Sequence, residues 1–117
     1  MAKVIFFLVG LSLLCDVSFG SIDSLRELVS VIRHSDQYAD EVMYGKHLYT
    51  VKWAKPIVLA YLSTHYKQES AEQWLNKYCY RTKSGRYIRA RKYGQEWQSA
   101  KDILNKVLIQ ERINASA

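Results

Sequence analysis

The sequence predicts an all-α fold, a small bundle of four to five helices with a short irregular or β-hairpin arm near residues 80–93. Three observations favour helices. Breakers are scarce after the first 20 residues, where the glycines and prolines are only Gly45, Gly85, Gly94 and Pro56, whereas a sandwich of short strands needs turn residues at every connection. Apolar residues recur at helical spacing in several segments. Two segments begin with the Ser-x-x-Glu/Gln pattern of a capping box.

The beginning of the chain has the layout of a secretory signal peptide. Lys3 supplies a positive charge, apolar residues follow from 4 to 14, and Ser18 and Gly20 are the small residues that a signal peptidase reads. The apolar run is about half of the ~20 residues that span a bilayer as a helix. We therefore expect residues 1–20 to be removed and residues 21–117 to form one secreted, extracellular domain with no stable membrane span.

The first two helices are expected between residues 24 and 42. Ser24 and Glu27 form a capping-box pattern, and apolar residues follow at i, i+3, i+4 and i+7 up to a helix end near His34. Ser35 or Asp36 is a suitable cap for a second helix.

Residues 42–53 are ambiguous. Gly45-Lys46 lies between two apolar and aromatic runs, as in a hairpin with a Gly-X turn. The same residues could continue a helix through Gly45 at a cost of about 1 kcal/mol. We favour the helix because the flanking segments have helical patterns.

Three further helices are expected downstream. Pro56 suits a first helical turn, and the apolar residues 57–62 make that helix the candidate for the most buried one. Ser70 and Gln73 form a second capping box. The last helix is predicted by the helical spacing of Trp97, Ala100, Ile103, Leu104, Val107 and Leu108. The three tryptophans fall in three predicted elements, where they could form the centre of the core or line a cavity for an apolar ligand.

Basic and aromatic residues are concentrated before the last helix. The net charge is +6, and no acidic residue occurs between Glu72 and Glu96. Arginine binds phosphate or sulfate through two donors, and tyrosine rings stack on bases or sugars. We expect an anionic partner to contact Lys77, Arg81, Lys83, Arg86, Arg89, Arg91, Lys92, Tyr80 and Tyr87.

Few residues suggest covalent chemistry or modification. Cys79 is the single cysteine after the predicted signal peptide, so it is either buried or a candidate for an intermolecular disulfide in a homodimer. Asn114 begins an N-glycosylation sequon. We identify no catalytic residues, no metal site and no cofactor motif.

These observations predict a secreted, basic, non-enzymatic interaction protein of the effector type. Its partner would be an anionic macromolecule, such as a sulfated glycan or nucleic acid, or a host or other extracellular protein. One alternative is a helical carrier of a small apolar ligand. The other is a membrane-active cationic protein, although the last predicted helix mixes acids with bases on its polar face.

One segment resembles a known family. Trp74, Lys77-Tyr78, Gly85, Tyr87 and Tyr93 resemble the C-terminal part of insect chemosensory proteins. That resemblance implies a small secreted helical carrier of apolar ligands. The cysteine framework of that family is absent from this chain, and we transfer no binding residue from it.

Overall fold

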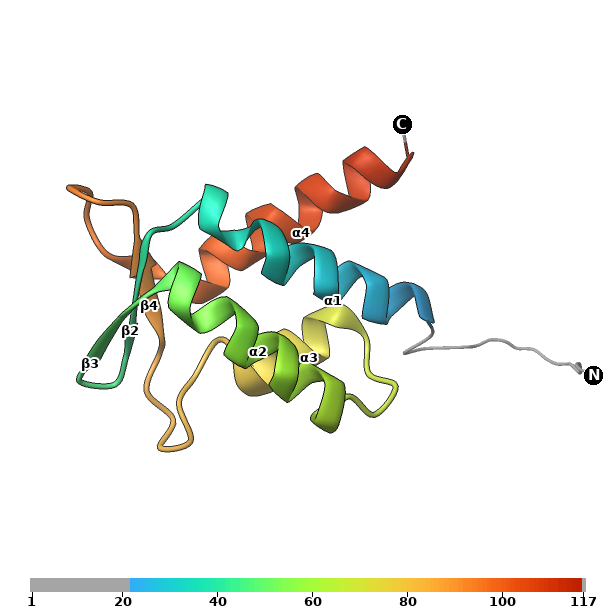
Figure 1. Cartoon of the computed structure of the whole chain (residues 1–117), viewed down its shortest axis with the longest axis horizontal. Coiled ribbons are helices and arrows are strands. Elements are labelled where there is room, and N and C mark those ends of the chain that lie inside the picture. Colours follow the sequence, from blue (N-terminus) through green and yellow to red (C-terminus); the bar gives the residue numbers. More distant parts are fainter. Residues whose placement is uncertain (1–21, 117) are drawn as a thin grey trace, which may run out of the picture.

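The structure, a computed structural model, describes residues 22–116. These residues form four α-helices and a four-stranded antiparallel sheet (Figure 1). The predicted signal peptide lies outside the described residues. In chain order the elements are α1 (Ile22–His34), the 3₁₀ turn η1 (Ser35–Gln37), β2 (Glu41–Tyr44), β3 (His47–Thr50), α2 (Val51–His65), α3 (Ala71–Tyr78), β4 (Arg89–Arg91), β5 (Gln98–Ser99) and α4 (Ala100–Ser116). The prediction of an all-α bundle is therefore wrong.

The sheet joins segments that are distant in sequence. Its strand order is β3-β2-β4-β5, and Val42 of β2 lies opposite Tyr49 of β3 on one side and Ala90 of β4 on the other. The region predicted as an arm near residues 80–93 is therefore divided. Its second part, β4, lies inside the sheet, while the loop that precedes β4 is closed by an isolated bridge between Arg81 and Tyr87.

The helix favoured for residues 42–53 is also wrong, because these residues form the β2–β3 hairpin and the first turn of α2. Gly45 sits in the turn with φ +63°, a conformation that glycine adopts without the steric cost of a side chain. Pairing with β4 provides hydrogen-bond partners for the edge of β2 that faces away from β3. The second helix expected after Ser35 or Asp36 is only the single turn η1.

Helix α2 lies at the periphery, in contrast to the prediction that it would be the most buried helix. It begins after Thr50, whose hydroxyl accepts a hydrogen bond from the Trp53 amide. Within α2 only Val51 and Leu62 are buried. Trp53, Ile57 and Tyr61 are 55%, 49% and 37% exposed. Because these residues are four apart, they share one outward face of the helix.

The main core lies between α1, α3, α4 and the end of α2. Its buried members are Leu28, Val31, Ile32, Leu62, Ala71, Trp74, Leu75, Tyr80, Val107 and Leu108. A second, smaller cluster joins the sheet region to α4 through Ala39, Val51, Ala90 and Ile103. Within residues 22–116, none of the helices is both long enough and apolar enough to cross a membrane.

The capping predictions have different outcomes. The Ser70 capping box is confirmed, since the Ser70 hydroxyl accepts from the Gln73 amide at 3.2 Å and the Gln73 side chain accepts from the Ser70 amide at 3.1 Å. The Ser24 capping box is wrong, because α1 already begins at Ile22. Trp97, predicted on the last helix, precedes β5. The Ser99 hydroxyl instead accepts from the Asp102 amide at the start of α4.

Candidate functional site

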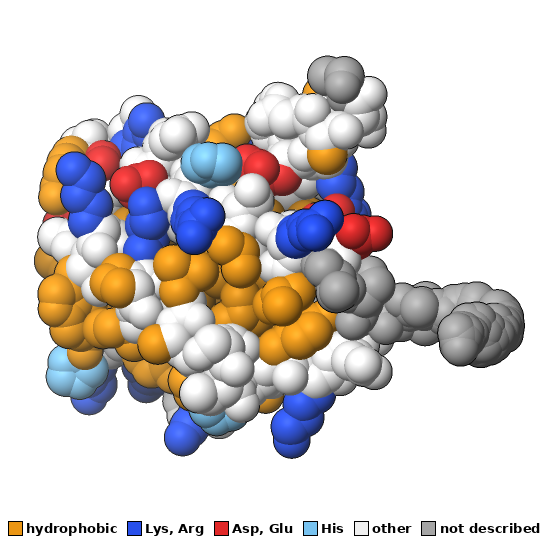
Figure 2. Space-filling view, turned by 45° about the vertical axis from the view of Figure 1, so that its right-hand side comes forward, with side chains coloured by type: hydrophobic (Ala, Val, Ile, Leu, Met, Phe, Trp, Pro, Cys, Tyr) orange, Lys and Arg blue, Asp and Glu red, His pale blue; other side chains and the backbone are white. Residues whose placement is uncertain are grey.

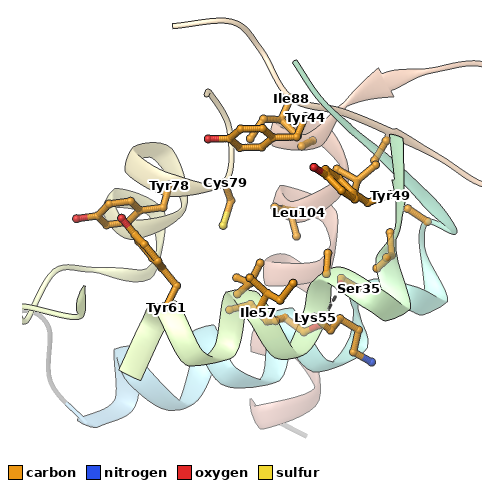
Figure 3. A pocket seen from close by; sticks show the side chains of 18 of the residues that line it. Ser35, Tyr44, Tyr49, Lys55, Ile57, Tyr61, Tyr78, Cys79, Ile88 and Leu104 are labelled. Carbon is orange, nitrogen blue, oxygen red and sulfur yellow. Dashed lines mark hydrogen bonds between the residues drawn. The ribbon is translucent and has the colours of Figure 1, made fainter. Parts of the chain in front are cut away.

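A single apolar cleft stands out among the described residues. It has a volume of about 530 Å³ and is bordered by α2, the sheet, the end of α3 and the first turns of α4 (Figure 3). Ile57 on α2 and Ile88 before β4 face each other across it, and Leu104 lies at its base. Clefts of this size, lined mainly by aliphatic and aromatic side chains, are typical of small-molecule sites.

The outward face of α2 forms one wall of the cleft. Trp53, Ile57 and Tyr61, which the main core leaves exposed, all line it. The sequence contains the signal for this wall, since α2 is apolar around most of its circumference. Such a pattern predicts full burial, but an all-round apolar helix can equally bury one face in the core and present the other to a ligand.

Aromatic contacts support both ends of the cleft. At one end Tyr49 stacks on Trp53, with ring centroids 4.7 Å apart and an interplanar angle of 10°. At the other end Tyr61 and Tyr78 meet edge to face at 5.2 Å (Figure 3). Contacts between rings at these distances are favourable beyond simple burial, so the walls are fixed by neighbours on different elements.

Trp74 belongs to both the core and the cleft. It is fully buried, lines the cleft, and packs against Tyr78 with ring centroids 4.9 Å apart. Its indole N–H has no hydrogen-bond acceptor among the described residues. A buried donor without an acceptor costs about 1–3 kcal/mol. Trp53 also lines the cleft, whereas Trp97 does not. The three tryptophans therefore do not form one shared centre of the core, and they do not line the cleft together.

Two acid-free stretches of the sequence meet at this cleft. The first, residues 42–68, contributes Tyr44, Tyr49 and Lys55, and the second, residues 73–95, contributes Lys77, Arg81 and Lys83. Antiparallel pairing of β2 with β4 brings the two stretches together. Among the described residues that line the cleft there is no aspartate and no glutamate.

The four cations that line the cleft differ in their partners. Lys55 pairs with Asp36 at 3.1 Å, and Lys77 pairs with Glu69 at 3.0 Å. Desolvation by burial acts to raise the pKa of Glu69, but the hydrogen bonds from the Lys77 side chain and the Lys67 amide outweigh it, so that the pKa is lowered.

Arg81 and Lys83 have no carboxylate partner within residues 22–116. The guanidinium of Arg81 lies over the Tyr87 ring at 4.4 Å and donates to the Tyr87 hydroxyl at 2.6 Å. The uncompensated positive charge at the cleft is therefore on the loop that follows α3.

The remaining residues of the predicted anionic site are dispersed. Arg91 donates to Glu41 at 3.0 Å and lies over the Trp97 ring at 4.4 Å, so it holds β2 and the loop before β5. Tyr80 is 5% exposed and belongs to the main core. Arg86, Arg89 and Lys92 are exposed and form no ion pair in the described part of the chain.

Cys79 points into the cleft rather than away from it (Figure 3). Desolvation by burial raises the pKa of its thiol to about 12. The reactive thiolate is therefore scarce at neutral pH.

Asn114 lies exposed on the last turn of α4. The described residues contain no group of three His, Cys, Asp or Glu side chains that could hold a metal ion.

Hydrophobic side chains are also conspicuous on the surface. Figure 2 shows them gathered over a broad area of one face, with Lys and Arg side chains above and below it.

Comparison with known proteins finds no matching family model and no significant match among curated proteins or solved structures. We therefore infer the function from the cleft and its charges.

Proposed function

We propose that the secreted chain is a non-enzymatic binding protein that holds a small, elongated apolar molecule in the cleft beside α2. The observation that carries this proposal is the outward apolar face of α2, which forms a wall of a cleft of about 530 Å³ although its residues stay accessible. A ligand that fills such a cleft removes apolar surface from water, which favours binding by about 25 cal/mol for each Å² buried.

Dodecanol is a suitable first probe because it is elongated, apolar and uncharged. Trp53 and Trp74 both line the cleft, so their fluorescence should change when it binds. Ile57→Glu introduces a charge on the α2 wall and should weaken dodecanol binding at least about tenfold, since burying an unpaired carboxylate is strongly unfavourable. Ile57 is already 49% exposed, so the variant should still fold.

Ile113→Glu is the matched control. Ile113 is 56% exposed on α4 and does not line the cleft, so this substitution should leave dodecanol binding unchanged. Circular dichroism would verify the fold of both variants. The proposal is wrong if dodecanol leaves the tryptophan fluorescence unchanged, or if both glutamate variants bind dodecanol as the wild type does.

A second candidate function is binding of a sulfated glycan or nucleic acid by the basic loops around β4. It is supported by Arg86, Arg89 and Lys92, at the start of β4 and in the loops on either side of it, which form no ion pair within residues 22–116 and leave their charges available to an external anion. Replacing these three residues with alanine should lower the salt concentration that elutes the protein from heparin resin. On duplex DNA the log–log salt slope should fall by about 2–3.

The control for this experiment removes the same charge elsewhere. Lys52, Lys101 and Lys106 are exposed cations outside the loops around β4. Their triple alanine variant should elute from heparin closer to the wild type. Equal elution of the two triple variants would show that net charge alone governs retention and would exclude a specific site at the loops around β4.

A further inference from the structure

We propose that the ligand of the cleft is a single-chain anionic amphiphile whose carboxylate or other acidic head binds Arg81 and Lys83. This inference rests on the proposed function, since it assigns the chemical class of a molecule held in the same cleft. Its basis is the charge distribution of the lining, which has four cations and no acidic residue among the described positions. An apolar cleft with a cationic border is complementary to a molecule with an apolar chain and an acidic end.

The location of the head follows from the ion pairs. Asp36 already compensates Lys55, and Glu69 already compensates Lys77. Arg81 and Lys83 keep their charge uncompensated within residues 22–116, and both follow Cys79, whose thiol points into the cleft (Figure 3). The acidic head therefore lies against the loop after α3, and the apolar chain extends along Ile57 and Leu104.

Arg81 is held in position before any ligand arrives. The Tyr87 ring lies under its guanidinium at 4.4 Å, and the Tyr87 hydroxyl accepts one of its N–H groups at 2.6 Å. A guanidinium has five N–H donors in a planar fork. The donors that Tyr87 leaves free can bind both oxygens of a carboxylate, and a pre-positioned donor loses less conformational freedom on binding.

The test compares three probes with the same chain and different heads, namely dodecanoate, dodecanol and dodecyltrimethylammonium. Each is titrated at neutral pH, below its aggregation threshold, with tryptophan fluorescence as the readout. Wild-type protein should bind dodecanoate about tenfold more tightly than dodecanol, the effect of a charge-assisted bidentate contact. It should bind dodecyltrimethylammonium more weakly than dodecanol. Added salt should weaken the binding of dodecanoate and leave that of dodecanol unchanged.

The double variant Arg81→Gln/Lys83→Gln separates the head from the chain. It should lose the preference for dodecanoate and retain the wild-type affinity for dodecanol, which also shows that the cleft is intact. Arg86→Gln is the matched control, because Arg86 belongs to the same loop and is exposed but does not line the cleft. It should retain the preference for dodecanoate.

Several outcomes would overturn the inference while leaving the proposed function standing. These are equal binding of dodecanoate and dodecanol by the wild type, a preference for dodecanoate that survives in the double variant, and an equal loss in Arg86→Gln. Binding to anionic phospholipid vesicles without binding of monomeric dodecanoate would replace the amphiphile by a membrane surface. If none of the three probes binds, the proposed function itself fails.

Discussion

Replacing Arg112 with alanine should destabilise the protein, because this side chain connects three helices. Arg112 of α4 donates to both carboxylate oxygens of Glu27 on α1, at 2.8 and 3.1 Å. It also donates to both oxygens of Glu72 on α3, at 2.9 and 3.1 Å. The two carboxylates hold the pKa of Arg112 above its ordinary value. The substitution removes all four hydrogen bonds and leaves the two glutamates without their shared cation.

The expected loss is moderate because the group is accessible to water. The side chains of Arg112 and Glu72 are 43% and 52% exposed, while that of Glu27 is 30% exposed. Exposed ion pairs contribute about 0.2–1 kcal/mol each, and bidentate geometry places these two in the upper part of that range. Their sum is about 1.5 kcal/mol, which corresponds to a fall in Tm of roughly 6–12 °C for a domain of this size.

Urea denaturation followed by circular dichroism would measure the loss. Arg112→Lys keeps the charge but not the fork, so it should lose a smaller part of the stability. Arg26→Ala is the control, since Arg26 is an exposed arginine of α1 without an ion pair among the described residues. It should change the free energy of unfolding by less than about 0.5 kcal/mol. A loss in Arg112→Ala no larger than that in Arg26→Ala would contradict a stabilising role of Arg112.

The same contact predicts a pH dependence of stability. The hydrogen bond from Arg112 lowers the pKa of Glu72 from its ordinary value of 4.5 in the folded protein. A carboxylate with a lowered pKa in the folded state stabilises the fold above its unfolded pKa, and that contribution is lost as pH falls through the folded pKa. The difference in unfolding free energy between wild type and Arg112→Ala should therefore shrink below about pH 4.5. A difference that stays constant into strong acid would contradict this.

Three further predictions concern the core, a turn and the thiol. Leu28→Ala, at a fully buried position, should lower the free energy of unfolding in urea by about 3 kcal/mol, whereas Leu48→Ala, at a position 51% exposed, should lower it by less than about 1 kcal/mol. Similar losses in the two variants would contradict the placement of Leu28 in the core. Gly45→Ala should lower the free energy of unfolding by about 1 kcal/mol through backbone strain alone, because φ is +63° and nothing lies within 4 Å of an added Cβ. An unchanged denaturation midpoint would argue against this turn. Cys79 should react slowly with a thiol reagent in native protein at neutral pH and rapidly in denaturant, since burial raises its pKa to about 12; rapid native labelling would show that the thiol is accessible.

Helical segments with strong local signals were predictable. The α3 helix begins directly after Ser70 because the hydroxyl and amide groups of the capping box lie within four consecutive residues. Most of α1 and the apolar stripe of α4 from Ala100 to Leu108 are determined in the same way, by contacts between residues three or four apart. The start of α1 was misplaced because Ser24 has a capping pattern inside a helix that begins earlier.

The strands were not predictable by the same reasoning. β2 has hydrogen-bonding partners on both sides, and the β4 partner lies about 50 residues away, where Glu41 is opposite Arg91. Nothing local to residues 42–53 reveals that partner, so neighbouring helices biased the choice toward helix. The Gly45-Lys46 pair was a correct local signal for the turn of the hairpin. The basic stretch was likewise interpreted as free of counter-charges because Glu41 and Glu69 are outside it in sequence.

By itself the sequence determined the short-range features of this protein, namely most of its helices, its net positive charge and the clustering of its cations. Tertiary structure alone decided that β2 and β4 pair, that the apolar face of α2 borders a cleft, and that, within residues 22–116, Arg81 and Lys83 keep an uncompensated charge while Lys77 and Arg91 do not. The physical reason is range. Helical hydrogen bonds and caps connect residues up to four apart, whereas strand pairing, ion pairing and cleft formation depend on which distant segments the chain brings together.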